Sequence, residues 1–164
     1  MTLAPRPTQT LRVLLHTRRT ATLGTQSLHT DEAPGLALVP YAIDGLAECL
    51  VLLVSASAAH SRQMLAHSEV SLLVAQSDAS QQVVHIHERV SIVGQARTPT
   101  PGSSAWGSAR YAYLRRFPDA ASMAQLGDFR IVCIVPEQAR HIAGFGAVRN
   151  VDQAELRAVL ASPH

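Results

Sequence analysis

The apolar residues of this chain fall into short runs separated by turn residues. Runs rich in Val, Ile and Leu are typical of β-strands, and they lie at residues 20–27, 36–43, 49–55, 70–76, 82–97, 128–136 and 139–148. The tight turn DGLAE joins the second run to the third, which predicts a hairpin. Pro40 within the second run indicates an edge position or a bulge.

Other stretches carry apolar residues at helical spacing, and these predict helices at 10–19, 105–117 and 152–161, with a short one at 119–125. Asp152 and Glu155 form a capping-box-like start for the last helix. Residues 1–9 read as a loose arm, and 152–164 as a C-terminal helix and tail. The pattern predicts one mainly β domain over 1–164, a small antiparallel barrel with peripheral helices. No G-x-G-x-x-G follows a strand, which argues against a Rossmann sheet.

Composition narrows the class of protein. The chain is 47% hydrophobic and 16% charged with a formal charge of +2, and all 14 of its basic residues are arginines without a basic block. We therefore expect no nucleic-acid partner. The apolar runs are too short for a membrane helix and the N-terminus has no signal-peptide core, so we expect a cytoplasmic protein with no membrane partner. Cys49 and Cys133 lie in apolar runs without a Cys-x-x-Cys pair, which favours buried reduced thiols.

The stretch VLLVSASAAHSRQML carries candidate chemistry, because a buried strand runs through two serines into a helix. With Ser57 as the N-cap, free backbone N–H groups and the helix dipole would attract an anion. Ser55 and Ser61 add hydroxyls, Arg62 adds a guanidinium, and His60 adds a ring N–H. These are the parts of a phosphate cradle. The alternative is an ordinary capped surface helix.

The order of segments adds a resemblance to a known family. TATLGTQS, GLALVPYAID and CLVLLVSASAAHSRQMLAHSEVSLLVA resemble the pyridoxamine 5′-phosphate oxidase-like, FMN-binding split-barrel proteins. VSIVGQA, RYAYLRRFPDA and LGDFRIVCIVPEQARHIAGFG resemble their HugZ-like haem-utilisation branch, so that the resemblance covers about residues 10–150. It implies a six-stranded antiparallel split barrel and a homodimer with flavin sites at the interface.

The resemblance also implies which residues bind FMN. The phosphate would lie at the strand-to-helix stretch, and the ring along residues 38–41, with Thr22 and Thr25 nearby. The implied cofactor-binding residues are Ser55, Ser57, His60, Ser61, Arg62, Leu38, Val39, Pro40, Tyr41 and Thr22.

The resemblance further implies the activity of a flavin-dependent reductase or oxidase with an unknown small-molecule substrate. The alternatives are a haem-binding or haem-degrading protein of the HugZ-like type and a flavin-binding module without catalysis. No side chain stands out as a catalytic acid or base. Pyridoxamine 5′-phosphate oxidases proper carry a lysine in the pair matching Arg62 and Gln63, and a C-terminal arginine segment. This chain has neither feature, so the resemblance does not extend to oxidation of pyridoxamine phosphate.

The histidines and one aromatic helix raise further hypotheses. His85 and His87 lie two apart in a strand-like run, either as a metal-binding edge or as an ordinary surface pair. In the haem-degrading relatives a histidine near the C-terminus ligates haem with support from an Asp in GDF, which implies His164 and Asp128 here and makes haem the alternative cofactor. The helix with Trp106 either closes over the flavin or covers the core.

Overall fold

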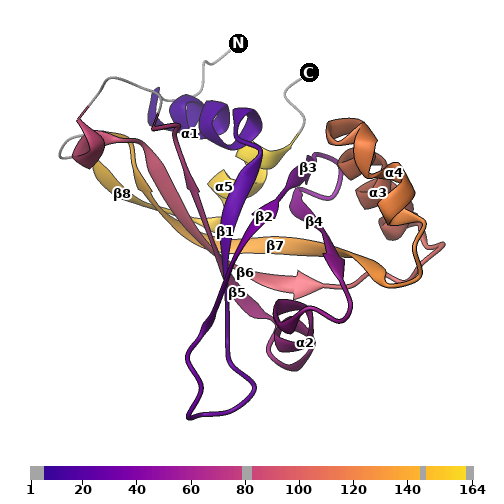
Figure 1. The fold of residues 1–164 in the computed structure, drawn as a ribbon. Coiled ribbons are helices and arrows are strands. Elements are labelled where there is room, and N and C mark those ends of the chain that lie inside the picture. The colour runs from indigo at the N-terminus through magenta and orange to yellow at the C-terminus, as the bar shows by residue number, and fades with distance from the viewer. Residues whose placement is uncertain (1–5, 79–82, 145–146, 162–164) are drawn as a thin grey trace.

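The computed structural model describes residues 6–78, 83–144 and 147–161. Their centre is one antiparallel sheet with the strand order β2-β1-β5-β6-β7-β4-β3 (Figure 1). Strand β8 pairs with the C-terminal part of β7, residues 139–142. The strands are β1 (Thr20–Thr25), β2 (Gly35–Pro40), β3 (Ala42–Asp44), β4 (Cys49–Ser55), β5 (Glu69–Ala75), β6 (Arg89–Arg97), β7 (Phe129–Ile142) and β8 (Val148–Val151).

The sheet is strongly curled, because its first and last strands are two halves of one chain segment. β2 and β3 lie at opposite ends of the strand order, yet only Tyr41 separates them in the sequence. The expected strand 36–43 is therefore broken at Tyr41, whose backbone N–H bonds to the Arg19 carbonyl at 3.0 Å. Its first half pairs with β1 and its second half with β4, in the expected hairpin. Pro40 lies on an end strand of the path, as the sequence predicted.

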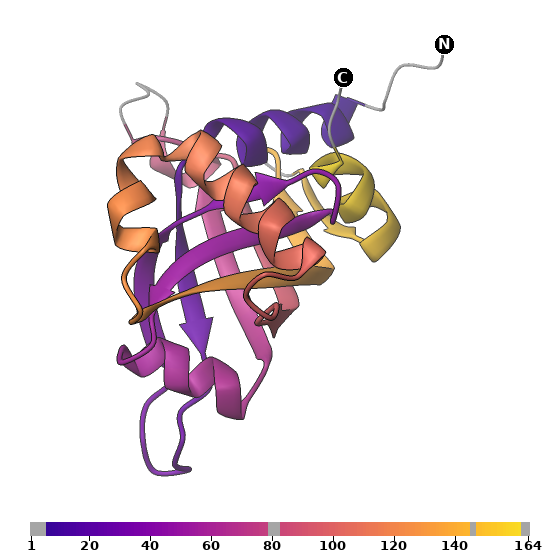
Figure 2. The same ribbon diagram turned by 90° about the vertical axis from the view of Figure 1, so that its right-hand side faces the viewer.

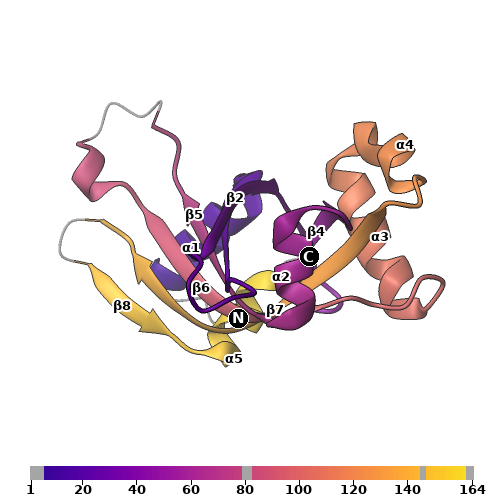
Figure 3. The ribbon, with the colours of Figure 1, turned by 60° about the horizontal axis from the view of Figure 1, so that its bottom comes forward.

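Helices cover the two ends and one outer side of this half-barrel (Figures 2 and 3). They are α1 (Arg6–Thr17), α2 (Ala59–Ala66), α3 (Ser104–Arg116), α4 (Ala121–Ala124) and α5 (Gln153–Leu160), with 3₁₀ turns η1 (Val84–Ile86) and η2 (Pro118–Ala120). Helices α1 and α5 lie side by side at one end, and α2 lies at the opposite end. None of the helices in the described ranges is long and apolar enough to cross a membrane.

Two apolar clusters hold the layers together. The larger one fills the inside of the curled sheet and takes in Leu11, Leu14 and Leu15 from α1 and Leu156, Val159 and Leu160 from α5. The smaller one lies outside the sheet, where Ala109 and Tyr113 of α3 pack on β3, β4 and β7. The helix that carries Trp106 thus covers a core, with Trp106 half-buried at its margin.

The expected loose arm is wrong from Arg6 onward, because α1 begins there. The physical reason is a set of contacts with α5, far away in sequence. The Thr8 hydroxyl donates to the Glu155 carboxylate at 3.2 Å, and Arg12 donates to the Ala158 carbonyl at 3.0 Å. The capping interaction predicted for α5 is confirmed, since Asp152 accepts from the Glu155 N–H at 2.9 Å.

The expected strand 82–97 is also shorter than the sequence indicated. Residues Val84–Ile86 form a 3₁₀ turn, closed by a bond from the His87 N–H to the Val84 carbonyl at 3.1 Å. Strand β6 begins only at Arg89, so His85 and His87 do not form the edge of a strand. Across the described ranges, no three His, Cys, Asp or Glu side chains are grouped to hold a metal ion.

A buried polar network fastens β8 and α5 to the sheet. The His141 ring is fully buried, its Nε2 lies 2.7 Å from Glu88, and its Nδ1 accepts from Arg149 at 3.2 Å. Arg149 also donates two hydrogen bonds to Glu155, at 3.0 and 2.7 Å, and this pairing lowers the pKa of the Glu155 carboxyl. His141 is thus structural, because both of its ring nitrogens have protein partners.

Substitutions at two glycines test the packing of the sheet and of α3. A Cβ at Gly94, beside the bulge in β6, would lie 2.6 Å from the Val135 carbonyl oxygen. We expect Gly94→Ala to lower the free energy of unfolding by about 2–3 kcal/mol, because backbone must move to make room. Gly107→Ala on α3 is the control, since a Cβ there meets nothing within 4 Å. It should raise stability by about 0.5–1 kcal/mol. Urea denaturation measures both, and equal effects would contradict the assigned packing.

Candidate functional site

The strand-to-helix junction differs from the expected cradle at its first helical turn. Helix α2 begins at Ala59, and its N-cap is Ala58, whose side chain makes no capping bond. The prediction that Ser57 caps the helix is therefore wrong. The Ser57 hydroxyl is turned instead toward Asp128, which precedes β7.

Ser55, Ser57 and Asp128 form a cluster of side chains at this junction, which we call the serine–aspartate cluster. The Ser55 hydroxyl donates to Asp128 Oδ2 at 2.5 Å, the Ser57 hydroxyl approaches the same oxygen at 3.4 Å, and the two hydroxyls are 2.9 Å apart. Pairing of Ser55 with Phe129 in the β4–β7 ladder places Asp128 there. The backbone N–H of Ala56 also bonds to the Asp128 carbonyl, at 2.6 Å. A carboxylate thus holds the hydroxyls that were expected to bind phosphate.

The other predicted phosphate-binding side chains make no hydrogen bond to Asp128. The buried Ser61 hydroxyl donates to the Ser55 carbonyl at 2.5 Å. Arg62 is exposed and its side chain makes no hydrogen bond or ion pair with the described residues. His60 is half-buried, and desolvation lowers the pKa of its ring, which favours the neutral imidazole.

The residues expected beside a flavin ring divide between two faces of the sheet. Leu38 and Pro40 are exposed on the outer face, and Thr22 lies opposite Leu38 in the β1–β2 ladder. Val39 and Tyr41 are buried. Because side chains alternate along a strand, only Leu38, Pro40 and Thr22 are placed to touch a flat ligand on the outside.

Thr25, on the other side of β1, has a structural role instead. Its hydroxyl donates to Gln63 Oε1 at 2.6 Å, which ties α2 to the sheet. A Cβ at Gly35 would lie 2.4 Å from that same oxygen, so the bond needs glycine there.

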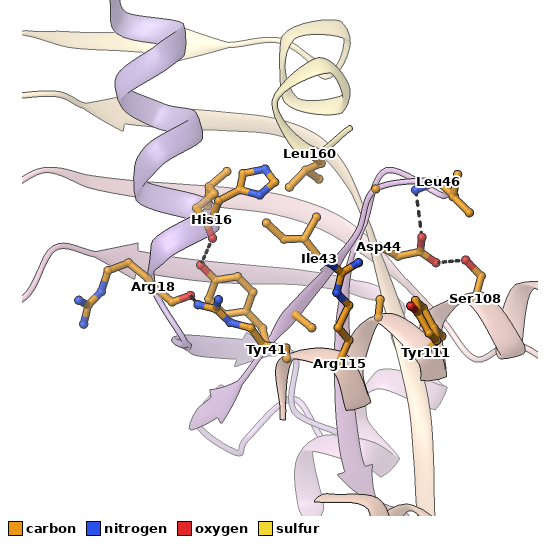
Figure 4. A pocket seen from close by; sticks show the side chains of 15 residues that line it. His16, Arg18, Tyr41, Ile43, Asp44, Leu46, Ser108, Tyr111, Arg115 and Leu160 are labelled. Atoms are coloured by element: carbon orange, nitrogen blue, oxygen red, sulfur yellow. Dashed lines mark hydrogen bonds between the residues drawn. The ribbon is translucent and has the colours of Figure 1, made fainter. Parts of the chain in front are cut away.

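A cleft of about 560 Å³ lies at the other end of β4, between α1, β3, α3 and α5 (Figure 4). Its walls include His16, Ile43, Asp44, Tyr111 and Arg115. Sequence reasoning missed this cleft, because its walls come from four segments that are far apart along the chain. The cluster of arginines in YLRRF was visible, but nothing local shows which of them faces a cavity.

The cleft carries unbalanced positive charge. The acid in its wall, Asp44, is buried and already accepts hydrogen bonds from the Ser108 hydroxyl at 2.7 Å and from two backbone N–H groups of the β3–β4 turn. The Arg116 guanidinium donates hydrogen bonds to the carbonyls of Thr17 and Arg18 at the end of α1. Arg115 points into the space beside Ile43 and makes no hydrogen bond or ion pair with the described residues. The cleft can therefore accept an anionic group at Arg115.

Tyr41 forms part of the cleft floor rather than a cofactor contact. Its hydroxyl donates to the Leu15 carbonyl at 2.6 Å, and burial raises the pKa of the phenol. Both facts keep Tyr41 a neutral structural link between β2, β3 and α1.

Sequence comparison gives no relative, since the chain matches no family model and no curated protein. Solved structures show the fold. A heme-binding protein from Mycobacterium smegmatis matches with a TM-score of 0.84 and 23% identity over 99% of this chain and 64% of that one. HutZ, the heme storage protein of Vibrio cholerae, matches with a TM-score of 0.71 and 20% identity over 81% of this chain and 92% of that one.

A candidate pyridoxamine 5′-phosphate oxidase of Listeria innocua matches with a TM-score of 0.63 and 17% identity over 84% of this chain and 98% of that one. The chain therefore has the split-barrel fold of the pyridoxamine 5′-phosphate oxidase-like proteins. It spans only 64% of the length of the M. smegmatis protein. Fold likeness at these identities does not carry function with it.

The serine–aspartate cluster leads to a prediction about anion binding. We expect Asp128→Ala to tighten FMN binding at least about fivefold, because repulsion between unit charges about 4 Å apart costs about 1 kcal/mol even in water. Quenching of flavin fluorescence in a titration measures this. Asp119→Ala removes an exposed acid elsewhere and serves as the control. Equal FMN affinity in the wild type and in Asp128→Ala would show that the carboxylate does not block the junction.

Proposed function

We propose that this protein binds haem beside the serine–aspartate cluster. The observation that supports the proposal is the Asp128 carboxylate lying against Ser55, where a phosphate-binding site would need free hydroxyls. A carboxylate that accepts the second ring N–H of a ligating histidine orients the imidazole and raises its basicity. The heme-binding and heme storage proteins among the structural matches share this fold.

A histidine that held haem iron would bind it through a neutral imidazole, so we consider which histidines could fill this role. Among the described residues, His60 is the histidine nearest in sequence to Ser55 and Ser57. It lies in the first turn of α2, and burial lowers the pKa of its ring, which favours the neutral imidazole. His164, the ligand implied by the family resemblance, lies outside the described residues. Its role stays a prediction, so both histidines enter the test.

The outer face of β2 supplies the apolar contacts that a porphyrin requires. Leu36 and Leu38 are 79% and 73% exposed, and Leu73 lies beyond Thr22 on the same face. Exposed leucines in such a row are unfavourable in water and suit a covered surface. We propose that a second copy of the chain covers this face, giving a homodimer with the ligand near the interface.

Binding of FMN, with flavin-dependent oxidation or reduction, has less support. Two of the proposed phosphate donors are held by Asp128, and a third, Ser61, donates to a backbone carbonyl. A negatively charged phosphate would also have to displace or approach that carboxylate. The fold is compatible with a flavoprotein, but the residues at the junction do not fit a phosphate as they stand.

Titration of the purified protein with hemin tests the proposal. We expect a Soret band that shifts on binding, with a dissociation constant in the micromolar range or below. Loss of the ligating histidine, through His60→Ala or His164→Ala, should weaken binding by about tenfold or more and alter the band. His67→Ala, at the exposed C-terminal end of α2, should bind like the wild type. Micromolar binding of FMN without binding of hemin would contradict the proposal.

The cleft supports a second candidate function, binding of a small organic anion with an apolar body. The observation that supports it is the position of Arg115, which faces a cavity of about 560 Å³. The acidic residue in the wall of this cavity, Asp44, is already hydrogen bonded to Ser108. Cavities of this size are usual for small-molecule ligands. Leu15, Ile43 and Leu160 would contact the apolar part of such a ligand.

Fluorescence of 1-anilinonaphthalene-8-sulfonate, an aromatic anion, tests this second function. We expect Arg115→Gln to weaken binding of the dye about tenfold, since a charge-assisted hydrogen bond is worth about 1.5–3 kcal/mol. Arg140→Gln, an exposed arginine on β7, is the matched control. If both variants bind the dye like the wild type, Arg115 does not form an anion site.

A further inference from the structure

A second, smaller pocket lies beside a different face of α3 from the cleft. Its volume is about 220 Å³, and its walls come from the first half of α3, the loop before α3 and the turn from α4 into β7. Its floor is the outer face of the β4–β7 ladder, where Leu53 pairs with Ile131 and Phe129 follows on the same face. This volume is below the usual range for drug-sized ligands, so the pocket suits a ligand of about one ring.

The lining of this pocket is largely apolar and aromatic. Trp106, the only tryptophan of the chain, is half-buried and packs against the smaller apolar cluster. Leu126, from the turn before β7, adds an apolar side chain that is 56% exposed. The rings of Trp106 and Phe129 can contact the face or the edge of a planar group. This lining favours an organic ring over an inorganic ion.

Arg110 supplies a positive charge at the pocket. Its guanidinium carbon lies over the Trp106 ring, 5.7 Å from the ring centre, and the side chain makes no hydrogen bond or ion pair with the described residues. Stacking uses the face of the guanidinium, so the N–H groups in its plane stay available. A planar fork of N–H donors matches the two oxygens of a carboxylate.

The positive charge of the pocket has no acid to balance it. None of the described residues that line the pocket is acidic. Asp128 lies next to the lining residues in the sequence, but its carboxylate accepts hydrogen bonds within the serine–aspartate cluster. Arg130 donates to the carbonyls of Gly127 and Phe129, which fixes the turn that forms one wall. The pocket is therefore suited to an anion.

We propose that this pocket binds an aromatic carboxylate. The carboxylate accepts two parallel hydrogen bonds from the Arg110 guanidinium, and the ring lies on the apolar floor beside Trp106 and Phe129. This site is separate from the cleft, because Arg110 and Arg115 lie about 140° apart around the helix and each lines a different cavity. It is also independent of the haem proposal, which uses neither arginine.

Fluorescence of Trp106 reports on this pocket directly, because the chain has no other tryptophan. We expect benzoate to change the emission saturably, with a dissociation constant in the millimolar range or below. Arg110→Gln should weaken binding about tenfold, because it removes charge-assisted hydrogen bonds. Arg140→Gln, an exposed arginine on β7, is the control and should bind benzoate like the wild type. Benzamide, which keeps the ring, and acetate, which keeps the charge, should each bind about tenfold more weakly than benzoate.

Three results would overturn the proposal. One is a Trp106 emission that benzoate leaves unchanged at concentrations well above the millimolar range. Another is equal binding of benzoate and benzamide, because the pocket would then not recognise the charge. The third is a folded Arg110→Gln variant that binds benzoate like the wild type. Circular dichroism shows whether each variant is folded. Arg110→Lys provides a second variant, which should bind with intermediate affinity because it keeps the charge but loses the planar fork.

Discussion

The pairing of β4 with β7 is the contact on which the rest of this structure depends. It joins the hairpin that closes the curled sheet to the long strand that also carries β6 and β8. At one end of the ladder it sets Ser55 beside Asp128, and further along it sets Cys49 beside Cys133. Helix α3 packs on its outer face, which positions Arg115 at the cleft. The serine–aspartate cluster, the cysteine pair and the position of α3 beside the cleft thus all depend on one register.

The charges at the strand-to-helix junction bear on whether FMN or haem is the more favourable ligand there. Hydroxyls and backbone N–H groups at a strand-to-helix turn favour an anion, but a carboxylate within hydrogen-bond distance reverses that preference. A histidine-ligated iron benefits from the same carboxylate. In our proposal, Asp128 is the side chain that favours haem over FMN at this junction.

Sequence reasoning succeeded where the interactions are local. The β3–β4 turn and the Asp152 cap depend on neighbours within a few residues, and both were predicted. Ser57 was misassigned because its partner Asp128 lies 71 residues away. The break at Tyr41 was missed because it depends on which strands pair with the two halves of the segment 36–43. The cleft beside Arg115 was missed because its walls come from four segments that are distant in the sequence.

A crystal structure of the haem-loaded protein tests the central claim most directly. Our account predicts a histidine imidazole on the iron, with its second ring N–H directed to Asp128 and with Ser55 still bonded to that carboxylate. Haem bound in the cleft beside Arg115, with Asp128 remote from the iron ligand, would contradict it.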